Sequence, residues 1–187
     1  MDHLREIQLN SQNIFDGKIL HLRRDSVQLP NGAEAVREVI RHIGAVCIVA
    51  LTDDGQIVVE RQFRYPLDEV ITEIPAGKLD RPDEDPLEAA KRELREETGA
   101  TAERWTALGQ FYPAAAYTDE RLWIYLAEGL SFGGRSLDDD EFLDVQTMPL
   151  EALVDEIMAG RVPDAKTQAA VLRVWLMKNR QTPGQAG

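Results

Sequence analysis

Hydrophobic and polar residues alternate along the first forty positions, a pattern typical of β-strands with one covered face. Residues 14–32 (IFDGKILHLRRDSVQLPNG) carry this alternation and end in Pro-Asn-Gly, a turn signal. Residues 35–43 (AVREVIRHI) are then expected to form the returning strand. The pattern therefore predicts a small antiparallel β-sheet at the N-terminus.

The rest of the chain carries longer apolar runs that are separated by turn residues. The expected strands are residues 44–52 (GAVCIVALT), 55–63 (GQIVVERQF), 69–77 (EVITEIPAG), 103–113 (ERWTALGQFYP) and 121–130 (RLWIYLAEGL). The first two of these strands should form a hairpin across residues 53–55. An amphipathic helix over residues 150–160 ends at Gly160, and Asp164 caps a last helix. Strands enclosed by helices predict an α/β fold in which a sheet is covered on both faces, an α/β/α layering.

Residues 77–100 (GKLDRPDEDPLEAAKRELREETGA) contain the most informative helix. Asp85 can act as its N-cap, Pro86 fits the first helical position, and Glu88 has the spacing of a capping box. Gly99 suits the left-handed residue that ends a helix. The apolar residues of this helix follow a helical period and predict a buried stripe of Leu87, Ala90 and Leu94.

Acidic side chains gather on another face of the same helix. Glu93 and Glu97 are four positions apart, with Glu96 beside them, and like charges at this spacing oppose helix formation by roughly 0.2–0.5 kcal/mol per pair. Converging carboxylates suit Mg²⁺ or Mn²⁺, which prefer oxygen ligands. The alternative is a solvated face whose charge is balanced by Lys91, Arg92 and Arg95. The full spacing of the segment favours the metal site.

This segment resembles the Nudix box, GX5EX7REUXEEXGU, in which U is a bulky apolar residue. The matching residues are Gly77, Glu84, Arg92, Glu93, Leu94, Glu96, Glu97 and Gly99. Two positions depart from the pattern. Residues 78–83 provide six spacer positions instead of five, and Ala100 is smaller than the usual apolar residue. The additional residue falls in a loop, where extra length costs little.

Four further segments resemble the ADP-ribose pyrophosphatase branch of the Nudix hydrolases. They are residues 28–46 (QLPNGAEAVREVIRHIGAV), 71–80 (ITEIPAGKLD), 111–120 (FYPAAAYTDE) and 163–172 (PDAKTQAAVL). Pro113 is the feature associated with the ADP-ribose subgroup, although Ala-Ala-Ala follows it where many relatives have Ser-Pro-Gly. The resemblance implies a Nudix-type α/β/α sandwich with a mixed sheet plus the small N-terminal sheet. The expected division is a dimerisation and base-binding sheet at 1–42, a hydrolase domain at 43–180 and a disordered tail at 181–187.

The resemblance also implies the catalytic groups. Glu93, Glu96, Glu97 and the backbone carbonyl of Ala76 are the expected metal ligands. Arg92 is expected to pair with the Glu84 region and orient the acidic cluster, the alternative being a surface pair with Glu88 or Glu96. The base that activates water is expected in residues 136–142 (SLDDDEF), with Glu141 preferred over Asp140 and Asp139. A hydrophilic loop tip is the alternative for that segment.

The expected substrate contacts lie outside the box. Arg64 is a candidate phosphate clamp, because guanidinium geometry suits bidentate phosphate contacts; otherwise it is a charge at a strand end. Glu120 resembles a family residue that holds the terminal ribose. Phe15 and Arg37 resemble residues that hold adenine, often from the partner subunit, and Phe15 can equally belong to a sheet core.

The reaction that this resemblance implies is Mg²⁺-dependent hydrolysis of ADP-ribose to AMP and ribose 5-phosphate, with Mn²⁺ as a substitute. One alternative is a hydrolase of another nucleoside diphosphate sugar, of the GDP-mannose or ADP-glucose type. A second is a Nudix-like domain that binds ADP-ribose without cleaving it. Such sensors tend to lose box carboxylates, which this chain keeps. A homodimer through the N-terminal sheet is expected from the family's habit.

Composition narrows the classes of partner. The formal net charge of −12 argues against nucleic acid, because phosphate backbones select basic surfaces. A phosphorylated substrate is compatible with this charge when divalent cations reverse the local sign. No apolar run reaches the length of a membrane span, and the first residues lack the pattern of a signal peptide. The single cysteine, Cys47, is expected to be a buried small hydrophobe, and a cytoplasmic location is expected.

Overall fold

The computed structural model describes residues 2–137 and 142–180. The chain divides into two compact units. The N-terminal unit holds the residues up to Gly44 together with residues 112–121, and the C-terminal unit holds residues 45–111 and those from Leu122 onward. Residues 112–121 therefore belong with the N-terminal sheet, although the division expected from the sequence placed them in the hydrolase domain. The expected tail, residues 181–187, lies outside the described residues.

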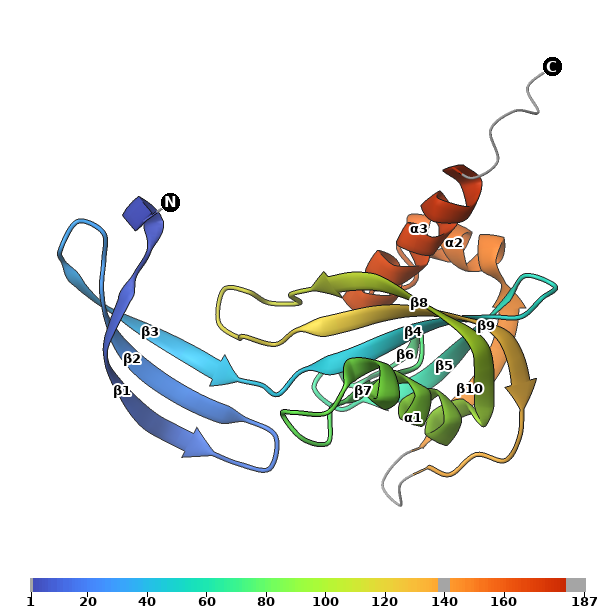
Figure 1. Ribbon diagram of the computed structural model, residues 1–187, viewed down its shortest axis with the longest axis horizontal. Helices are drawn as coiled ribbons and strands as arrows, with labels where there is room; N and C mark the ends of the chain where they lie inside the picture. The colour runs from blue at the N-terminus through green and yellow to red at the C-terminus, as the bar shows by residue number, and fades with distance from the viewer. Residues whose placement is uncertain (1, 138–141, 181–187) are drawn as a thin grey trace. The chain divides into compact units, whose positions relative to one another are not determined.

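The N-terminal unit is built on an antiparallel sheet of three strands, which confirms the predicted small sheet (Figure 1). After a short 3₁₀ helix at Asp2–Leu4, the strands are β1 (Ile7–Asp16), β2 (His21–Gln28) and β3 (Glu34–Arg41). Strands β2 and β3 pair in unbroken register, and the turn between them has Gly32 at φ 86° and the Asn31 side chain bonded to Ala33 N. This is the turn that Pro-Asn-Gly predicts.

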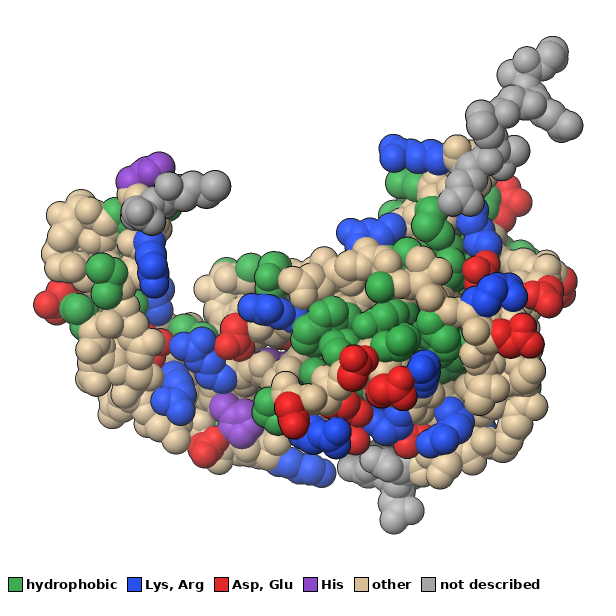
Figure 2. Space-filling model, in the orientation of Figure 1, with side chains coloured by type: hydrophobic (Ala, Val, Ile, Leu, Met, Phe, Trp, Pro, Cys, Tyr) green, Lys and Arg blue, Asp and Glu red, His purple; other side chains and the backbone are tan. Residues whose placement is uncertain are grey.

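Apolar side chains of this unit lie largely at its surface (Figure 2). The exposed ones are Leu4, Ile7, Leu9, Ile14, Phe15, Ile19, Leu20 and Val36. In the three strands, Val27 is buried together with the charged Asp25. Exposed apolar surface of this extent is typical of a protein–protein contact.

Residues 112–121 follow strand β8 (Ala100–Phe111) of the C-terminal unit and attach to the end of β3. Ile40 N donates to the carbonyl of Tyr117 at 2.8 Å, and Asp119 N donates to the carbonyl of Ile40 at 3.3 Å. Arg41 Nη1 lies 3.1 Å from Asp119 Oδ2, which adds an ion pair to these backbone bonds. The segment thereby extends the N-terminal unit.

A seven-stranded mixed sheet forms the C-terminal unit, in the order β10-β5-β4-β9-β8, with β6 paired to β5 and β7 paired to β4. Its strands are β4 (Ala45–Leu51), β5 (Gln56–Arg64), β6 (Glu69–Glu73), β7 (Ala76–Lys78), β8 (Ala100–Phe111), β9 (Leu122–Phe132) and β10 (Leu143–Pro149). Strands β4 and β9 are parallel, and the other pairs are antiparallel. Every residue of β4 is buried, because helices cover both faces of the sheet at its centre.

Helix α1 (Pro86–Thr98) covers one face of this sheet, while α2 (Leu150–Met158) and α3 (Ala165–Arg180) cover the other (Figure 1). The predicted α/β/α sandwich is therefore confirmed. Buried side chains of the sheet and of α2 and α3 form one continuous core that includes Cys47. Burial raises the pKa of the Cys47 thiol to about 12, so it remains protonated at neutral pH. No helix in the described part of the chain is long and apolar enough to cross a membrane.

Helix α1 begins and ends where the sequence predicts. The Asp85 side chain accepts hydrogen bonds from Leu87 N and Glu88 N, and Gly99 takes the left-handed conformation at φ 72°. The Glu88 carboxylate lies 2.7 Å from Lys91 Nζ, so it forms an i, i+3 ion pair. Ala90 and Leu94 are buried as expected and Leu87 is half-buried, but the inward face of α1 also includes Glu93 and Glu97.

Candidate active site

Two carboxylates are turned inward from α1 at the edge of the core. The exposed fraction is 9% for Glu93 and 5% for Glu97. Burying a carboxylate is unfavourable unless it is paired or hydrogen-bonded. Glu97 Oε2 accepts a hydrogen bond from Ala76 N at 3.1 Å, and Glu93 Oε1 lies 2.8 Å from Arg92 Nη1. These contacts stabilise both charges beside strand β7.

Arg92 brings the acidic groups of this region together. Its Nη1 lies 2.8 Å from Glu93 Oε1 and 3.2 Å from Glu96 Oε2, and its Nε lies 3.4 Å from Glu84 Oε1. Its Nη2 donates to the carbonyl of Lys78 at 3.1 Å. Burial acts to lower the pKa of Arg92, but the neighbouring carboxylates outweigh it and raise the pKa. Arg92 thus makes the contacts expected of an orienting residue, and its part in catalysis stays a prediction.

The loop that carries the extra residue folds into a compact turn. Glu84 N donates to the carbonyl of Arg81 at 3.1 Å, and Glu84 Oε2 accepts from Asp80 N at 2.7 Å. Burial acts to raise the pKa of Glu84, but the Asp80 N–H and the charge of Arg92 outweigh it, so the pKa is lowered. The inserted position leaves Glu84 in place beside Arg92.

Gly77 gives the Glu93 carboxylate its space. A Cβ added at Gly77 would stand 1.9 Å from Glu93 Cδ and 2.1 Å from its Oε1. Contacts this short do not occur, so any other residue would displace either β7 or Glu93. The first glycine of the box is therefore required by the close approach of α1 to β7.

The donor set in this region fits a hard divalent cation. A small polar cavity of about 230 Å³ lies between β7 and α1, lined by Gly77, Lys78, Asp80, Arg92, Glu93, Glu96 and Ser136. Within the described residues, no three or more His, Cys, Asp or Glu side chains lie close enough together to coordinate one ion. Arg92 instead contacts Glu93 and Glu96, while Glu97 contacts Ala76 N. Carboxylate oxygens around a polar cavity are the ligands that Mg²⁺ prefers.

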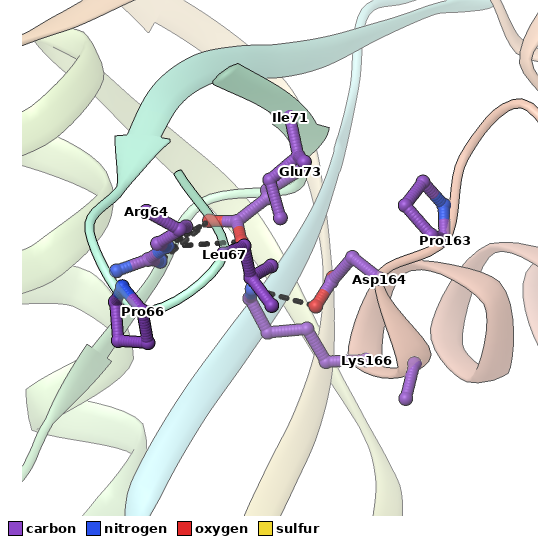
Figure 3. A pocket seen from close by; sticks show the side chains of 9 residues that line it. Arg64, Pro66, Leu67, Ile71, Glu73, Pro163, Asp164 and Lys166 are labelled. Atoms are coloured by element: carbon purple, nitrogen blue, oxygen red, sulfur yellow. Dashed lines mark hydrogen bonds and ion pairs between the residues drawn. The ribbon is translucent and has the colours of Figure 1, made fainter. Parts of the chain in front are cut away.

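Arg64 lies at the end of β5, apart from this cavity, in a second pocket of about 430 Å³ (Figure 3). Its Nε lies 3.1 Å from Glu73 Oε1 and its Nη2 lies 2.5 Å from Glu73 Oε2. Burial acts to lower the pKa of Arg64, but the hydrogen bonds and charge of Glu73 outweigh it, so the pKa is raised. Lys166 Nζ lies 3.1 Å from both Glu73 Oε1 and Asp164 Oδ1.

Sequence reasoning missed Glu73 and Lys166 as parts of this arrangement. The available signal was an acidic residue inside the expected strand 69–77. The structure buries this residue, since Glu73 is only 3% exposed. A buried charge requires a partner, but the sequence does not identify Lys166 as that partner.

The other predicted substrate residues belong to the N-terminal unit. Phe15 is 56% exposed on β1, so its side chain is not part of a sheet core. Arg37 on β3 lies 2.6 Å from Glu6 Oε1, and Glu120 Oε1 lies 3.9 Å from His42 Nδ1. The predicted base, Glu141, and its alternatives at 139 and 140 lie outside the described residues.

The C-terminal unit has a mixed sheet packed between helices, and the buried glutamates of α1 face a glycine of β7. This arrangement defines a Nudix-type domain. The chain belongs to the Nudix family: the model of the NUDIX domain matches residues 41–171. A second model, the nucleoside diphosphate sugar hydrolase N-terminal domain, matches residues 6–40. The resemblance read from the box is thereby confirmed.

Individual relatives extend over almost the whole chain. The ADP-ribose pyrophosphatase of Bacillus subtilis is 43% identical over 173 residues, which is 91% of this chain and 93% of the relative. The methanol dehydrogenase activator of Bacillus methanolicus is 41% identical over 89% of this chain and 90% of its own. A crystal structure of an ADP compounds hydrolase superimposes with a TM-score of 0.85 over 96% of this chain and 97% of that chain. Its sequence identity of 24% makes this a likeness of fold alone.

Proposed function

We propose that this chain is a Mg²⁺-dependent hydrolase that cleaves the diphosphate of ADP-ribose to give AMP and ribose 5-phosphate. The observation that carries the proposal is the pair of buried carboxylates, Glu93 and Glu97, held beside Gly77 and organised by Arg92. The similarity to the Bacillus subtilis ADP-ribose pyrophosphatase supports the choice of substrate.

Glu93, Glu96, Glu97 and the carbonyl of Ala76 would hold Mg²⁺, with Mn²⁺ as a substitute. When bound, the cation would offset the charge of the diphosphate and would make water a better nucleophile. Arg92 keeps Glu93 and Glu96 oriented toward the polar cavity.

The remaining residues act on the substrate and on the attacking water. Arg64 binds a phosphate oxygen, and Glu141 removes a proton from the attacking water, a step typically contributing about 10²–10⁴-fold. Phe15 and Arg37 hold the adenine, and Glu120 holds the terminal ribose. The attacking oxygen ends on one phosphate and the departing phosphate takes the bridging oxygen, so no covalent enzyme intermediate is required.

A second candidate is hydrolysis of a different nucleoside diphosphate sugar, such as GDP-mannose or ADP-glucose. The match of residues 6–40 to the nucleoside diphosphate sugar hydrolase N-terminal domain favours this breadth of substrate. We also propose a cytoplasmic enzyme, because its one cysteine is buried and free.

A nucleotide panel tests the substrate. With Mg²⁺ in ¹⁸O-labelled water, we expect ADP-ribose to be hydrolysed with a higher kcat/KM than ADP-glucose or GDP-mannose, giving equal amounts of AMP and ribose 5-phosphate. Mass analysis of the two products also shows which phosphorus is attacked. A higher kcat/KM for GDP-mannose would select the second candidate. Binding of ADP-ribose without turnover of any compound would contradict the proposal and indicate a sensor.

The N-terminal sheet is proposed to mediate a homodimer. Its exposed apolar residues, such as Leu9 at 50% exposed, would be covered by the same sheet of a second copy. We expect a dimer by light scattering at micromolar concentration, and a monomer for Leu9→Glu, which places a charge in that contact. Met158→Glu is the matched control, since Met158 is 73% exposed at the end of α2 in the other unit. A monomeric wild-type protein would refute the proposal.

A further inference from the structure

The first turn of α3 is held in a network of polar side chains that are mostly withdrawn from solvent. Asp164 Oδ2 accepts hydrogen bonds from Thr167 N at 2.9 Å and from Thr167 Oγ1 at 2.6 Å. Asp164 Oδ1 lies 3.1 Å from Lys166 Nζ. Thr167 is fully buried, and the Lys166 side chain is 12% exposed. Lys166 and Thr167 each make a further contact, to the end of β6 and to the residue that follows it.

The contact made by Lys166 leads to Arg64. Figure 3 shows the Glu73 carboxylate between the two cationic side chains, with the Lys166 side chain reaching it from α3. Glu73 binds Arg64 through the Nε and Nη2 edge of the guanidinium. This edge-on pairing fixes the plane of the guanidinium, so the direction in which Nη1 points is set by Glu73. Lys166 in turn holds Glu73.

The contact made by Thr167 leads to the metal-binding region. Thr167 Oγ1 accepts a hydrogen bond from Ile74 N at 3.0 Å, and Ile74 is fully buried. The next residue, Pro75, accepts from Ile48 N at 2.9 Å, and Ala76 N donates to Glu97 at 3.1 Å. The segment that joins β6 to β7 is therefore fixed by α3, by β4 and by α1 in succession.

We infer that Lys166 and Thr167 are positioning residues for the reaction: Lys166 sets Arg64 through Glu73, and Thr167 sets Ala76 and Glu97 through Ile74. The inference rests on the proposed function, in which Arg64 contacts phosphate and Ala76 and Glu97 hold the cation. A displacement of about 1 Å at such groups is enough to change rates by on the order of 10²-fold. A purely structural role, in which these contacts only hold α3 on the sheet, predicts a loss of stability alone.

Two variants with matched controls separate these roles. Lys166→Met keeps the aliphatic stem and removes the charge. Its control is Lys178→Met, because Lys178 is on the same helix and also forms an ion pair, 2.9 Å from Glu128. Thr167→Val removes the hydroxyl. Its control is Thr52→Val, because Thr52 Oγ1 likewise accepts a backbone N–H, from Gln56 at 2.9 Å.

The readouts are KM and kcat for ADP-ribose, Mn²⁺ affinity by electron paramagnetic resonance, and the melting temperature. We expect Lys166→Met to raise KM on the order of tenfold with unchanged Mn²⁺ affinity. We expect Thr167→Val to weaken Mn²⁺ binding on the order of tenfold, with KM at saturating metal unchanged. Both controls should match wild type. In an Arg64→Ala background, Lys166→Met should have no further effect on KM.

Variants that lose only melting temperature, with wild-type KM and Mn²⁺ affinity, would overturn the inference. If Lys166→Met fails to fold, Glu73→Gln tests the same link, and an unchanged KM there would overturn it too. The Mn²⁺ comparison of Thr167→Val with Thr52→Val needs no turnover. A wild-type protein that binds Mn²⁺ but leaves ADP-ribose intact would therefore reject the proposed function while this comparison still decides the role of Thr167.

Discussion

Replacing Glu97 with glutamine is expected to abolish Mg²⁺-dependent turnover while the fold stays intact. Glutamine has the shape of glutamate and keeps an oxygen that accepts the Ala76 N–H, so the contact at 3.1 Å survives. It loses the negative charge that a divalent cation requires. Metal ions contribute several kcal/mol to transition-state stabilisation, so the expected loss in kcat is about 10³-fold or more.

Product formation from ADP-ribose and thermal unfolding with and without Mg²⁺ together test this expectation. Wild-type protein should melt at higher temperature as Mg²⁺ is added, because a ligand that binds the folded state stabilises it, whereas the variant should show only the general effect of salt. Glu88→Gln is the control, because Glu88 is an exposed glutamate of the same helix. Near wild-type activity in purified Glu97→Gln would refute the assignment of this carboxylate.

Adding a single methyl group at Gly77 should have the second largest effect. The new Cβ would stand 1.9 Å from Glu93 Cδ. The Glu93 carboxylate has little freedom to move, because its Oε1 lies 2.8 Å from Arg92 Nη1 and its helix packs on the sheet. Either Glu93 or β7 has to move. Overpacking of this kind typically destabilises a protein by about 1–3 kcal/mol. Because Ala76 and Glu93 belong to the proposed metal site, we also expect turnover to fall by on the order of 10²-fold.

Gly134→Ala is the matched control for Gly77→Ala. A Cβ at Gly134 meets nothing within 4 Å. The control should keep its melting temperature and its activity. The measurement is kcat and Mn²⁺ affinity for both variants beside wild type. Wild-type values in Gly77→Ala would show that β7 and α1 adapt to the methyl group, and the close approach would then have no functional meaning.

Local signals in the sequence predicted the elements of the fold well. Asp85, Pro86 and Gly99 lie at the ends of α1 as expected, because caps act through hydrogen bonds to backbone groups within a few residues. The alternating pattern of residues 14–43 predicted the N-terminal sheet, since the period of two is a property of each strand alone. The spacing of the acidic residues identified the carboxylate face in the same way.

Contacts between distant segments were beyond such reasoning. Residues 112–121 follow a strand of the large sheet yet belong to the N-terminal unit, through backbone bonds to Ile40 that no local pattern encodes. The ion pair between Glu73 and Lys166 was equally hidden, because Lys166 is in another element and pairs with Glu73 only after β6 and α3 pack.

By itself, the sequence determined the helix with its caps, most of the strands and helices in their order, and the carboxylates that mark a Nudix enzyme, because these depend on residues close to one another in the chain. Only the tertiary structure decided that Gly77 makes room for Glu93 and that Thr167 holds Ile74. Thr167 and Ile74 are 93 positions apart in the sequence. Contacts across such separations form when the sheet and its helices pack. The periodic pattern of hydrophobic residues in the sequence carries no information about them.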